Sequence, residues 1–352
     1  MKLENRTNAF ITLGNVLRSF ITNTLETYSS NDCEKHFLDN LEFQINQAVH
    51  HNGWFTKENV YFALETWASV LSESNIKKWT DTYDFSKVSQ KTVGIVTAGN
   101  IPLVGFHDFI SVLMSGHTLL IKQSSNDQKL LPIIADFLIC IEPQFKDLIL
   151  FQEGKLQKFD AVIATGSNNT ARYFEHYFNK YPNIIRKNRN AIAVLTGNET
   201  TKEMEALGED VFRYFGLGCR SVSKIFVPKD YDFDKLFKAV YKHKVILEYE
   251  KYKNNYTYNK TVYLMSLMPL VENGFLVLKE DPSYASPIAT LFYEYYDSLE
   301  QLKNKIILEQ EQIQCVVSSN LTEDSIPFGT TQIPQLWDYA DGVDTLEFLL
   351  SL

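Results

Sequence analysis

The stretch Thr92-Val-Gly-Ile-Val-Thr-Ala98 decides the fold class of this 352-residue chain. It is short, apolar and rich in β-branched residues, which is typical of a strand buried in a parallel sheet. A turn with Gly99, Asn100 and Pro102 follows it and leads into a helical pattern that runs to about Met114. The stretch therefore predicts one strand–turn–helix unit of a parallel α/β fold.

The alternation of strands and helices continues on the carboxyl side. In the first half we expect strands at 118–121, 160–165 and 190–196 and helices at 128–141 and from Ser167 to about Phe178. From about residue 200 the pattern begins again, and we expect a helix at 202–215, a strand at 222–227, a helix from about Phe233, strands at 275–279 and 287–293, a helix at 299–308 and a strand at 313–318. This order predicts two parallel-sheet α/β domains with a cleft between them.

Residues 1–80 have the apolar periodicity of helices instead. Apolar stripes run from Phe10 to Tyr28, from Leu38 to Val49 and from Val60 to Leu71, and Thr56 is a suitable N-cap for the third helix. We therefore expect an N-terminal helical segment.

The composition excludes several classes of function. The chain is 45% hydrophobic and 22% charged, as an ordinary globular protein is. Its formal net charge is -9 and it holds no Lys/Arg block, which argues against nucleic acid or an anionic membrane surface as the main partner. It has neither a run of about 18 apolar residues nor an N-terminal signal pattern, so we expect no membrane span and a cytoplasmic location.

The cysteines and histidines show no metal-ligand spacing. No C-x-x-C pair and no H-E-x-x-H pattern occurs, so we expect no metal. The wide spacing of the four cysteines predicts reduced thiols in the cytoplasm; they are Cys33, Cys140, Cys219 and Cys315.

One of these cysteines stands in Gly216-Leu-Gly-Cys219-Arg-Ser221, just before an expected strand. Glycines let the backbone approach a ligand closely, and a turn can present backbone N–H groups that lower a thiol pKa below about 8.5. Arg220 adds positive charge beside it. Cys219 is therefore a candidate nucleophile, although an isolated cysteine is more often a buried structural residue.

Polar residues also follow three expected strands, where parallel α/β sheets bind ligands. The Asn100 amide is a candidate donor to an oxyanion, together with the Cys219 backbone N–H, although asparagine is also common in turns. Lys122 is placed to bond a ribose or a phosphate, or is a solvated strand end. Gly166 and Ser167 precede a helix whose N-terminus attracts phosphate, although they also suit ordinary capping.

The order of these signals resembles that of the aldehyde dehydrogenase superfamily. The stretches GIVTAGNIPLVG (94–105), LLIKQSS (119–125) and GLGCRSVSKIFVP (216–228) resemble the acyl-CoA reductase family, which includes the fatty-acyl reductase of bacterial luminescence. The match spans roughly residues 90–330, and Ile326-Pro-Phe-Gly329 is similar to a late Pro-Phe-Gly segment of the superfamily. The resemblance implies an aldehyde-dehydrogenase-like fold.

The resemblance also implies a reaction and the residues that perform it. Cys219 attacks an acyl thioester, an acyl-CoA or acyl-protein, and the acyl-cysteine is reduced to an aldehyde. Asn100 and the Cys219 N–H hold the oxyanion. Five residues bind the nicotinamide cofactor, with Lys122 at the adenosine ribose and Gly166 and Ser167 near the pyrophosphate; the remaining two are Ser124 and Ser125.

Two departures from the superfamily pattern bear on the reaction. Leu195 stands where hydrolytic aldehyde dehydrogenases have a water-activating Glu, which favours thioester reduction over oxidation to an acid. Residues 283–287 replace a Glu-x-Phe-Gly-Pro segment that contacts the nicotinamide ribose. Ser125 takes the place of an acidic residue, which predicts a preference for NADPH, with NADH possible because Asp127 is close by.

The resemblance divides the chain into four segments. They are an N-terminal helical segment that packs on the cofactor domain (1–85), a nicotinamide-dinucleotide-binding domain (86–200), a catalytic domain (201–322) and a C-terminal segment (323–352). The expected partners are the acyl substrate, an acyl-activating enzyme and a second copy in a homodimer. Two alternatives stay open: an acyl-phosphate reductase of the same superfamily, and a non-catalytic nucleotide- or CoA-binding module.

Overall fold

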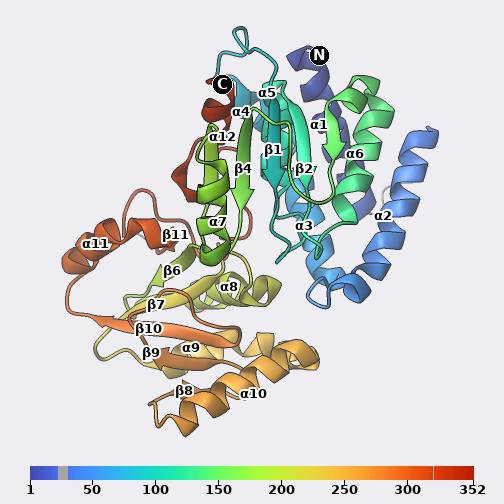
Figure 1. Cartoon of the computed structure of the whole chain (residues 1–352). Helices are drawn as coiled ribbons and strands as arrows, with labels where there is room; N and C mark the ends of the chain where they lie inside the picture. The colour runs from blue at the N-terminus through green and yellow to red at the C-terminus, as the bar shows by residue number, and fades with distance from the viewer. Residues whose placement is uncertain (23–30, 320) are drawn as a thin grey trace. The chain divides into compact units, whose positions relative to one another are not determined.

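A computed structural model describes residues 1–22, 31–319 and 321–352. The chain forms two compact units, which we describe separately. Unit 1 comprises Met1–Lys187 and Gln335–Leu352, and unit 2 comprises Asn188–Pro334. Figure 1 labels most of the helices and strands of both.

Unit 1 is built on a parallel sheet. Its described residues form five strands in the order β3-β2-β1-β4-β5: β1 (Thr92–Val96), β2 (Thr118–Lys122), β3 (Ile149–Phe151), β4 (Ala161–Thr165) and β5 (Asn183–Arg186). The central residues of β1, β2 and β4 are buried, as their apolar sequences predict. The parallel sheet predicted from Thr92–Ala98 is confirmed.

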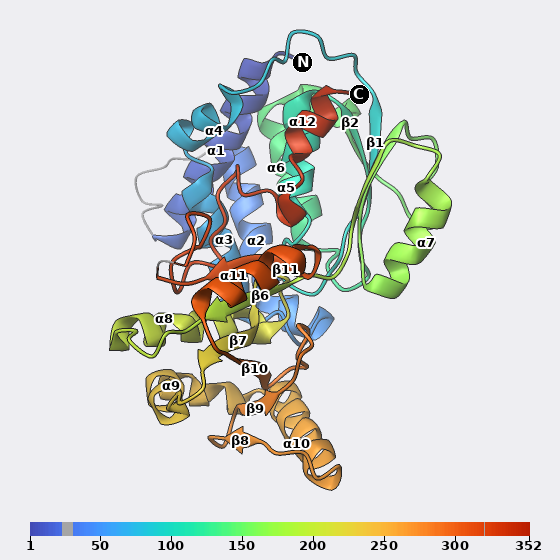
Figure 2. The same cartoon turned by 90° about the vertical axis from the view of Figure 1, so that its left-hand side faces the viewer.

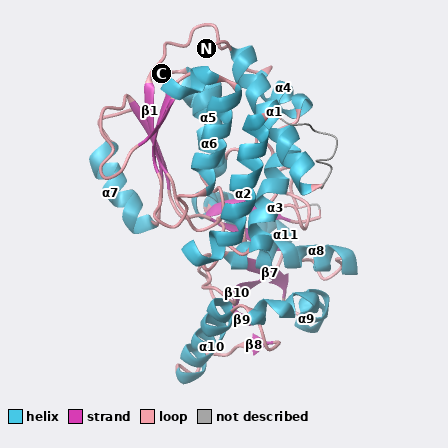
Figure 3. Ribbon diagram, turned by 90° about the vertical axis from the view of Figure 1, so that its right-hand side faces the viewer, coloured by secondary structure: helices cyan, strands magenta, loops and turns pink. Residues whose placement is uncertain are grey.

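Helices cover both faces of this sheet. Figures 2 and 3 show α7 (Asn168–Phe178) on one face and α5 (Phe106–Ser115) and α6 (Leu130–Ile141) on the other. The N-terminal helices pack outside α5 and α6, and they are α1 (Leu3–Ile21), α2 (Asp32–His51), α3 (Lys57–Val70) and α4 (Glu73–Thr80). The N-terminal helical segment is therefore confirmed, and Thr56 caps α3 by accepting a hydrogen bond from Asn59 N at 3.2 Å. The end of the first apolar stripe, Leu25 and Tyr28, lies outside the described residues.

Of the expected C-terminal segment 323–352, residues 335–352 belong to unit 1 and residues 323–334 belong to unit 2. Residues 335–352 carry α12 (Thr345–Leu350), which packs against α5. Arg186, at the end of β5, donates hydrogen bonds to Ala340 O and Thr345 Oγ1 at 2.8 Å each and forms a buried ion pair with Asp108 at 2.7 Å. This buried guanidinium fastens the last residues of the chain to the first sheet.

A disulfide in unit 1 corrects the expectation that all four cysteines are reduced. Cys33 on α2 is bonded to Cys140 on α6, with their Cα atoms 6.0 Å apart and a sequence separation of 107 positions. The pairing arises because α2 packs against α6, a contact that sequence spacing cannot reveal. Cys219 takes no part in this disulfide.

Unit 2 has a mixed sheet. In its described residues the strand order is β11-β6-β7-β10-β9-β8, with only β8 and β9 antiparallel to each other. The strands are β6 (Asn190–Val194), β7 (Val222–Pro228), β8 (Val271–Glu272), β9 (Val277–Glu280), β10 (Thr290–Tyr296) and β11 (Ile313–Val317). The helices are α8 (Thr201–Phe212), α9 (Phe233–Val240), α10 (Glu250–Met265) and α11 (Leu299–Leu308).

The structure differs from the expected elements in several places. The strand expected at 190–196 as a fourth strand of the first half is β6, which pairs with β7 and β11 in unit 2. Strands β3 and β5 were not expected, because β3 is a three-residue strand with two exposed residues and β5 is only partly buried. The helix α10 was not expected either, since its Tyr- and Asn-rich sequence lacks a clear apolar stripe.

No helix among the described residues is both long enough and apolar enough to cross a membrane.

Candidate active site

Unit 1 contains a cleft of about 1000 Å³ at the carboxyl ends of β1, β2 and β4. This is where the strand order reverses direction, the position at which open α/β sheets bind ligands. All five residues expected to bind the cofactor line this cleft, which we call the cofactor pocket after that expectation; they are Lys122, Ser124, Ser125, Gly166 and Ser167. The structure thus brings together residues from two separate strand ends.

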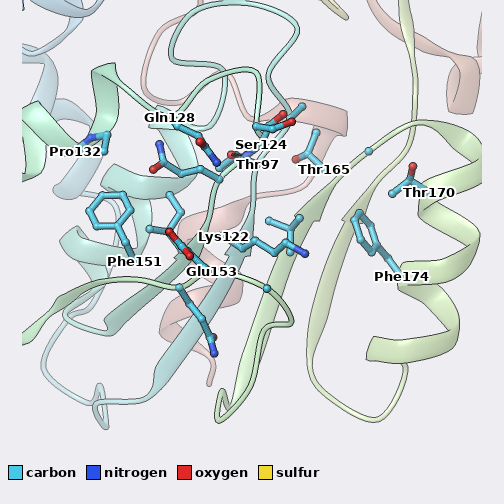
Figure 4. A pocket seen from close by; sticks show the side chains of 18 of the residues that line it. Thr97, Lys122, Ser124, Gln128, Pro132, Phe151, Glu153, Thr165, Thr170 and Phe174 are labelled. Atoms are coloured by element: carbon cyan, nitrogen blue, oxygen red, sulfur yellow. Dashed lines mark hydrogen bonds between the residues drawn. The ribbon is translucent and has the colours of Figure 1, made fainter. Parts of the chain in front are cut away.

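Lys122 ends β2 and is half-buried. Figure 4 shows its side chain extending toward the side of the pocket where Thr165 and Phe174 lie. Among the residues that the structure describes, none forms a hydrogen bond or ion pair with its ammonium group. A half-buried cation with no protein partner is suited to an anionic or hydroxyl-bearing ligand.

The N-terminus of α7 borders the same pocket. Ser167 is its N-cap, and its hydroxyl accepts a hydrogen bond from Thr170 N at 3.3 Å. A Cβ on Gly166 would lie 2.9 Å from the side chain of Thr170 and 3.0 Å from that of Phe174, so a larger residue does not fit. The glycine lets the backbone pass close to the start of α7, where the helix dipole favours a phosphate.

Asn100 lies in the loop between β1 and α5 and is half-buried. The start of this loop, Thr97 and Ala98, lines the cofactor pocket. At Gly99 the loop passes so close to Ser124 that a Cβ would lie 2.6 Å from its hydroxyl oxygen. The loop that carries Asn100 therefore contacts the segment that follows β2.

The sequence left Asp127 as a possible acidic contact for the cofactor ribose, but Asp127 does not line the cofactor pocket. Its side chain is buried outside the residues that line the cofactor pocket, and its Oδ2 accepts a hydrogen bond from Leu103 N at 3.0 Å. Burial raises the pKa of Asp127 to about 7, against the effect of the Leu103 N–H bond. Its carboxyl group serves the backbone of the Asn100 loop.

The sequence did not point to the acidic residue that does line the pocket. Glu153 is exposed there, in the loop after β3 (Figure 4). It follows a short edge strand that gives no strong sequence signal, so its position was not apparent. Apolar side chains that sequence reasoning also missed complete the pocket wall, and they are Pro132, Phe151 and Phe174.

Cys219 lies in unit 2, in a tight turn between α8 and β7. Ser221 N donates to Gly218 O at 2.9 Å, and Gly218 N donates to Ser221 Oγ at 3.2 Å. The preceding residues Tyr214 and Phe215 have φ values of 54° and 59°, in the left-handed region that costs non-glycine residues about 1–2 kcal/mol each. Such strain clusters at functional sites, and here it precedes a half-buried cysteine.

Residues just after the late Pro-Phe-Gly segment form hydrogen bonds with this turn. Arg220 Nε donates to Thr331 O at 2.6 Å, and Gln332 Nε2 donates to Ser221 Oγ at 3.3 Å. The buried carboxylate of Asp210 accepts hydrogen bonds from Gly329 N at 2.6 Å and Thr331 N at 3.0 Å. The late Pro-Phe-Gly segment is thereby tied to the Cys219 turn, and Asp210 is an anchor that the sequence did not reveal.

The structure also locates the two departures from the superfamily pattern. Leu195 is fully buried, and the next acidic residue, Glu199, accepts hydrogen bonds from Thr196 N at 2.5 Å and Gly197 N at 3.0 Å. In the segment 283–287, Tyr284 O accepts a hydrogen bond from Ser223 Oγ at 2.6 Å. The neighbouring Lys224 is fully buried and donates to Pro282 O at 2.8 Å, so both contacts come from β7.

The two expected catalytic residues lie on different units, Asn100 on unit 1 and Cys219 on unit 2. In the part of the chain that the structure describes, no group of three or more His, Cys, Asp or Glu side chains is arranged to hold a metal ion.

Solved structures with a similar fold include several aldehyde dehydrogenases. An acetylating aldehyde dehydrogenase from Geobacillus thermoglucosidasius has a TM-score of 0.62 at 10% identity, covering 95% of this chain and 83% of its own. An NAD-dependent aldehyde dehydrogenase from Sinorhizobium meliloti gives 0.63 at 12%, with coverages of 91% and 71%. An indole-3-acetaldehyde dehydrogenase in complex with NAD+ gives 0.64 at 12%, with coverages of 92% and 74%. These similarities confirm the aldehyde-dehydrogenase-like fold.

The sequence identifies the family within this fold. Residues 19–260 match the family model of the acyl-CoA reductases (LuxC), and the chain belongs to that family. This membership makes the protein an enzyme of aldehyde-related oxidoreduction. A search of curated proteins gave no match.

Proposed function

We propose that this protein reduces an acyl thioester to an aldehyde through a covalent acyl-cysteine on Cys219, with NADPH as the cofactor. The observation that carries the proposal is the strained, hydrogen-bonded turn that holds Cys219, in a chain of the acyl-CoA reductase family. Unit 1 is assigned to cofactor binding and unit 2 to the nucleophile.

The cofactor pocket fits a nicotinamide dinucleotide. The unpartnered Lys122 ammonium suits the adenosine ribose, and Gly166 with Ser167 and the start of α7 suits the pyrophosphate. One of the similar structures, the indole-3-acetaldehyde dehydrogenase, is a complex with NAD+. The reduced nicotinamide, when bound, supplies the hydride for the acyl group.

The preference for NADPH rests on the residues around the expected 2′-position. Ser125 lines the pocket and can donate to a 2′-phosphate, whereas Asp127 is buried against Leu103. Glu153 is the acidic residue of the lining that opposes this preference. We expect the dissociation constant for NADPH to be lower than that for NADH, and a constant for NADH tenfold below that for NADPH would contradict it.

Cys219 performs the acyl transfer. Its thiolate attacks the thioester carbonyl, the Asn100 amide and the Cys219 N–H stabilise the oxyanion, and the donor thiol leaves as the acyl-cysteine forms. After reduction, the thiohemiacetal on Cys219 releases the aldehyde and regenerates the thiolate.

The position of Leu195 favours reduction over hydrolysis. A buried leucine cannot activate water, and Glu199 is held by two backbone N–H groups. Without a general base, hydrolysis of the acyl-cysteine is slow, so the acyl group stays available for hydride transfer.

Intact mass spectrometry tests the proposal directly. The protein mixed with an acyl-CoA, in the absence of cofactor, should gain the mass of one acyl group, and this gain should disappear in Cys219→Ala. Cys315→Ala is the matched control and should keep the adduct, since Cys315 lies on β11. An adduct that persists in Cys219→Ala, or none in the wild type, would overturn the proposal. Parallel assays with an acyl phosphate separate the alternative substrate class.

A further inference from the structure

Two neighbouring loops of unit 1 carry different parts of the candidate site. The Asn100 loop (97–105) joins β1 to α5, and the cofactor loop (123–129) joins β2 to α6. Ser124 N donates to Thr97 Oγ1 at 3.3 Å, and Gly99 packs against Ser124 without room for a Cβ. The two loops are therefore in direct contact near the pocket.

Asn52, at the end of α2, forms hydrogen bonds with both loops. Its side chain is buried, and its Nδ2 donates to Gly99 O at 3.3 Å and to Asn126 O at 3.4 Å. Its Oδ1 accepts a hydrogen bond from Trp54 N at 3.1 Å. The Trp54 N–H on one side and two carbonyl oxygens on the other fix the orientation of the amide. One side chain from the N-terminal helices thus holds a carbonyl group of each loop.

Asp127 makes a second connection farther along the Asn100 loop. This residue belongs to the cofactor loop, and its Oδ2 accepts the hydrogen bond from Leu103 N at 3.0 Å. Leu103 has a φ of 58°, which costs a non-glycine residue about 1–2 kcal/mol. The buried Asp127 carboxyl group helps to hold Leu103 in this unfavourable conformation. The Asn100 segment therefore lies between two attachments to the cofactor loop.

We propose that Asn52 and Asp127 are positioning residues that couple occupancy of the cofactor pocket to the conformation of the Asn100 loop. A ligand that contacts Ser124 and Ser125 orders the cofactor loop. The two side chains transmit this order to residues 100–105, so a bound cofactor prepares the oxyanion donor before the acyl group arrives. The role of Asn100 as the oxyanion donor rests on the proposed function, whereas the coupling itself does not.

Hydrogen–deuterium exchange of the full chain, with and without saturating NADP+, tests the coupling. NADP+ should slow exchange in peptides that cover 123–129 and also in those that cover 100–105. In Asn52→Ala the protection of 123–129 should remain and that of 100–105 should be lost. Asn46→Ala, at an exposed position of the same helix, should behave as the wild type does. Protection of 100–105 that is absent in the wild type, or unchanged in Asn52→Ala, overturns the coupling.

A pair of variants at Asp127 keeps the test decisive if Asn52→Ala does not fold. Asp127→Asn retains an oxygen that accepts the Leu103 N–H, whereas Asp127→Ala does not. Protection of 100–105 by NADP+ should survive in Asp127→Asn and disappear in Asp127→Ala. Equal protection in both variants contradicts a positioning role for this side chain.

The rate of acyl-adduct formation on Cys219 links the coupling to the reaction. In the wild type, NADP+ should accelerate acylation about five- to tenfold, within the usual range of coupling between two sites. In Asn52→Ala and Asp127→Ala the ratio of rates with and without NADP+ should approach one, whereas general structural damage lowers both rates together. If no adduct forms in the wild type, the proposed function fails and the exchange result still decides the coupling. If the adduct forms but the ratio is already one in the wild type, the coupling fails alone.

Discussion

Each unit uses one buried aspartate to hold a loop of the candidate site, and the two aspartates differ in how fully they are satisfied. In unit 2, Asp210 accepts two backbone N–H groups, from Gly329 and Thr331. In unit 1, Asp127 accepts one, from Leu103. Burial raises the pKa of both carboxyl groups, and at Asp210 two backbone N–H bonds act against that rise.

The two aspartates therefore differ in how they hold their segments of backbone. The two N–H donors at Asp210 favour its charged form and fix the segment around Thr331. A carboxyl group with one such partner and a pKa of about 7 changes its charge near neutral pH. Asp210 thus holds the segment beside the Cys219 turn through two hydrogen bonds, whereas Asp127 holds the Asn100 loop through one.

The largest expected effect tests the anchor in unit 2. Asp210→Ala leaves the N–H groups of Gly329 and Thr331 without their acceptor, and each such loss costs about 1–3 kcal/mol. We expect the free energy of unfolding to fall by about 2–6 kcal/mol, measured by urea denaturation of the full chain. Glu205→Ala, at an exposed position of α8, is the control and should change it little. A loss below about 1 kcal/mol in Asp210→Ala would mean that the two N–H groups find other acceptors.

The corresponding change in unit 1 should be smaller. Asp127→Ala removes the acceptor of one N–H group, at about 1–3 kcal/mol, and it also removes a buried carboxyl group whose ionisation is unfavourable. At pH 8 we expect a net loss of unfolding free energy smaller than that in Asp210→Ala, by the same urea measurement. If Asp127→Ala proves equally or more destabilising, the contrast between the two aspartates is wrong.

The pH dependence sharpens the same contrast. The pKa of Asp127 is raised from 3.8 to about 7, so between these values the folded protein binds more protons than the unfolded chain. Its contribution to stability therefore decreases as pH rises through this window and is constant above it. Relative to the wild type, Asp127→Asn should become more stable as pH is raised from 5 to 8 in urea denaturation. A stability difference that does not change with pH would contradict the raised pKa.

A substitution in the cofactor pocket tests whether Ser125 lies where we expect the 2′-phosphate of NADPH. Ser125→Glu places a carboxylate where we expect the 2′-phosphate, and it should raise the dissociation constant for NADPH about tenfold, which is ~1.4 kcal/mol. The constant for NADH should not rise, and acylation of Cys219 without cofactor should be unchanged. Fluorescence titration with each dinucleotide measures the first effect. An equal rise for both dinucleotides would remove Ser125 from the 2′-position.

The smallest effect is expected at Glu153. This exposed carboxylate lines the pocket, and exposed charges contribute weakly. Glu153→Gln should lower the dissociation constant for NADPH about two- to fivefold and leave that for NADH nearly unchanged. The same titration measures it, and a rise in the NADPH constant would show that Glu153 supports cofactor binding.

The parts of the site that the sequence revealed share a physical basis. Lys122 and Gly166 each lie at the carboxyl end of a buried strand, and parallel strands bring these ends to one edge of a sheet. Their positions at the ends of parallel strands therefore sufficed to predict that these residues lie in one pocket. The turn around Cys219 was readable for a similar reason, since its two glycines and the strand after it lie within a few residues.

The parts that the sequence did not reveal depend on contacts between distant residues. Asp210 binds Gly329 across 119 positions, and Asn52 binds Gly99 across 47. Neither side chain stands in a motif, because a buried Asp or Asn that caps a remote backbone needs no special neighbours in sequence. The edge strand β3 was not predicted, because two of its three residues are exposed and it therefore lacks the pattern of a buried strand.

The Arg186 contacts have a consequence for how the protein is made. Because this buried guanidinium binds Ala340 O and Thr345 Oγ1, unit 1 needs the last stretch of the chain to complete its packing. Unit 2 is in effect an inserted domain, with both of its ends joined to unit 1. During synthesis from the N-terminus, all of residues 188–334 emerge before unit 1 receives α12. Unit 1 can therefore complete its packing only after unit 2 has been synthesised.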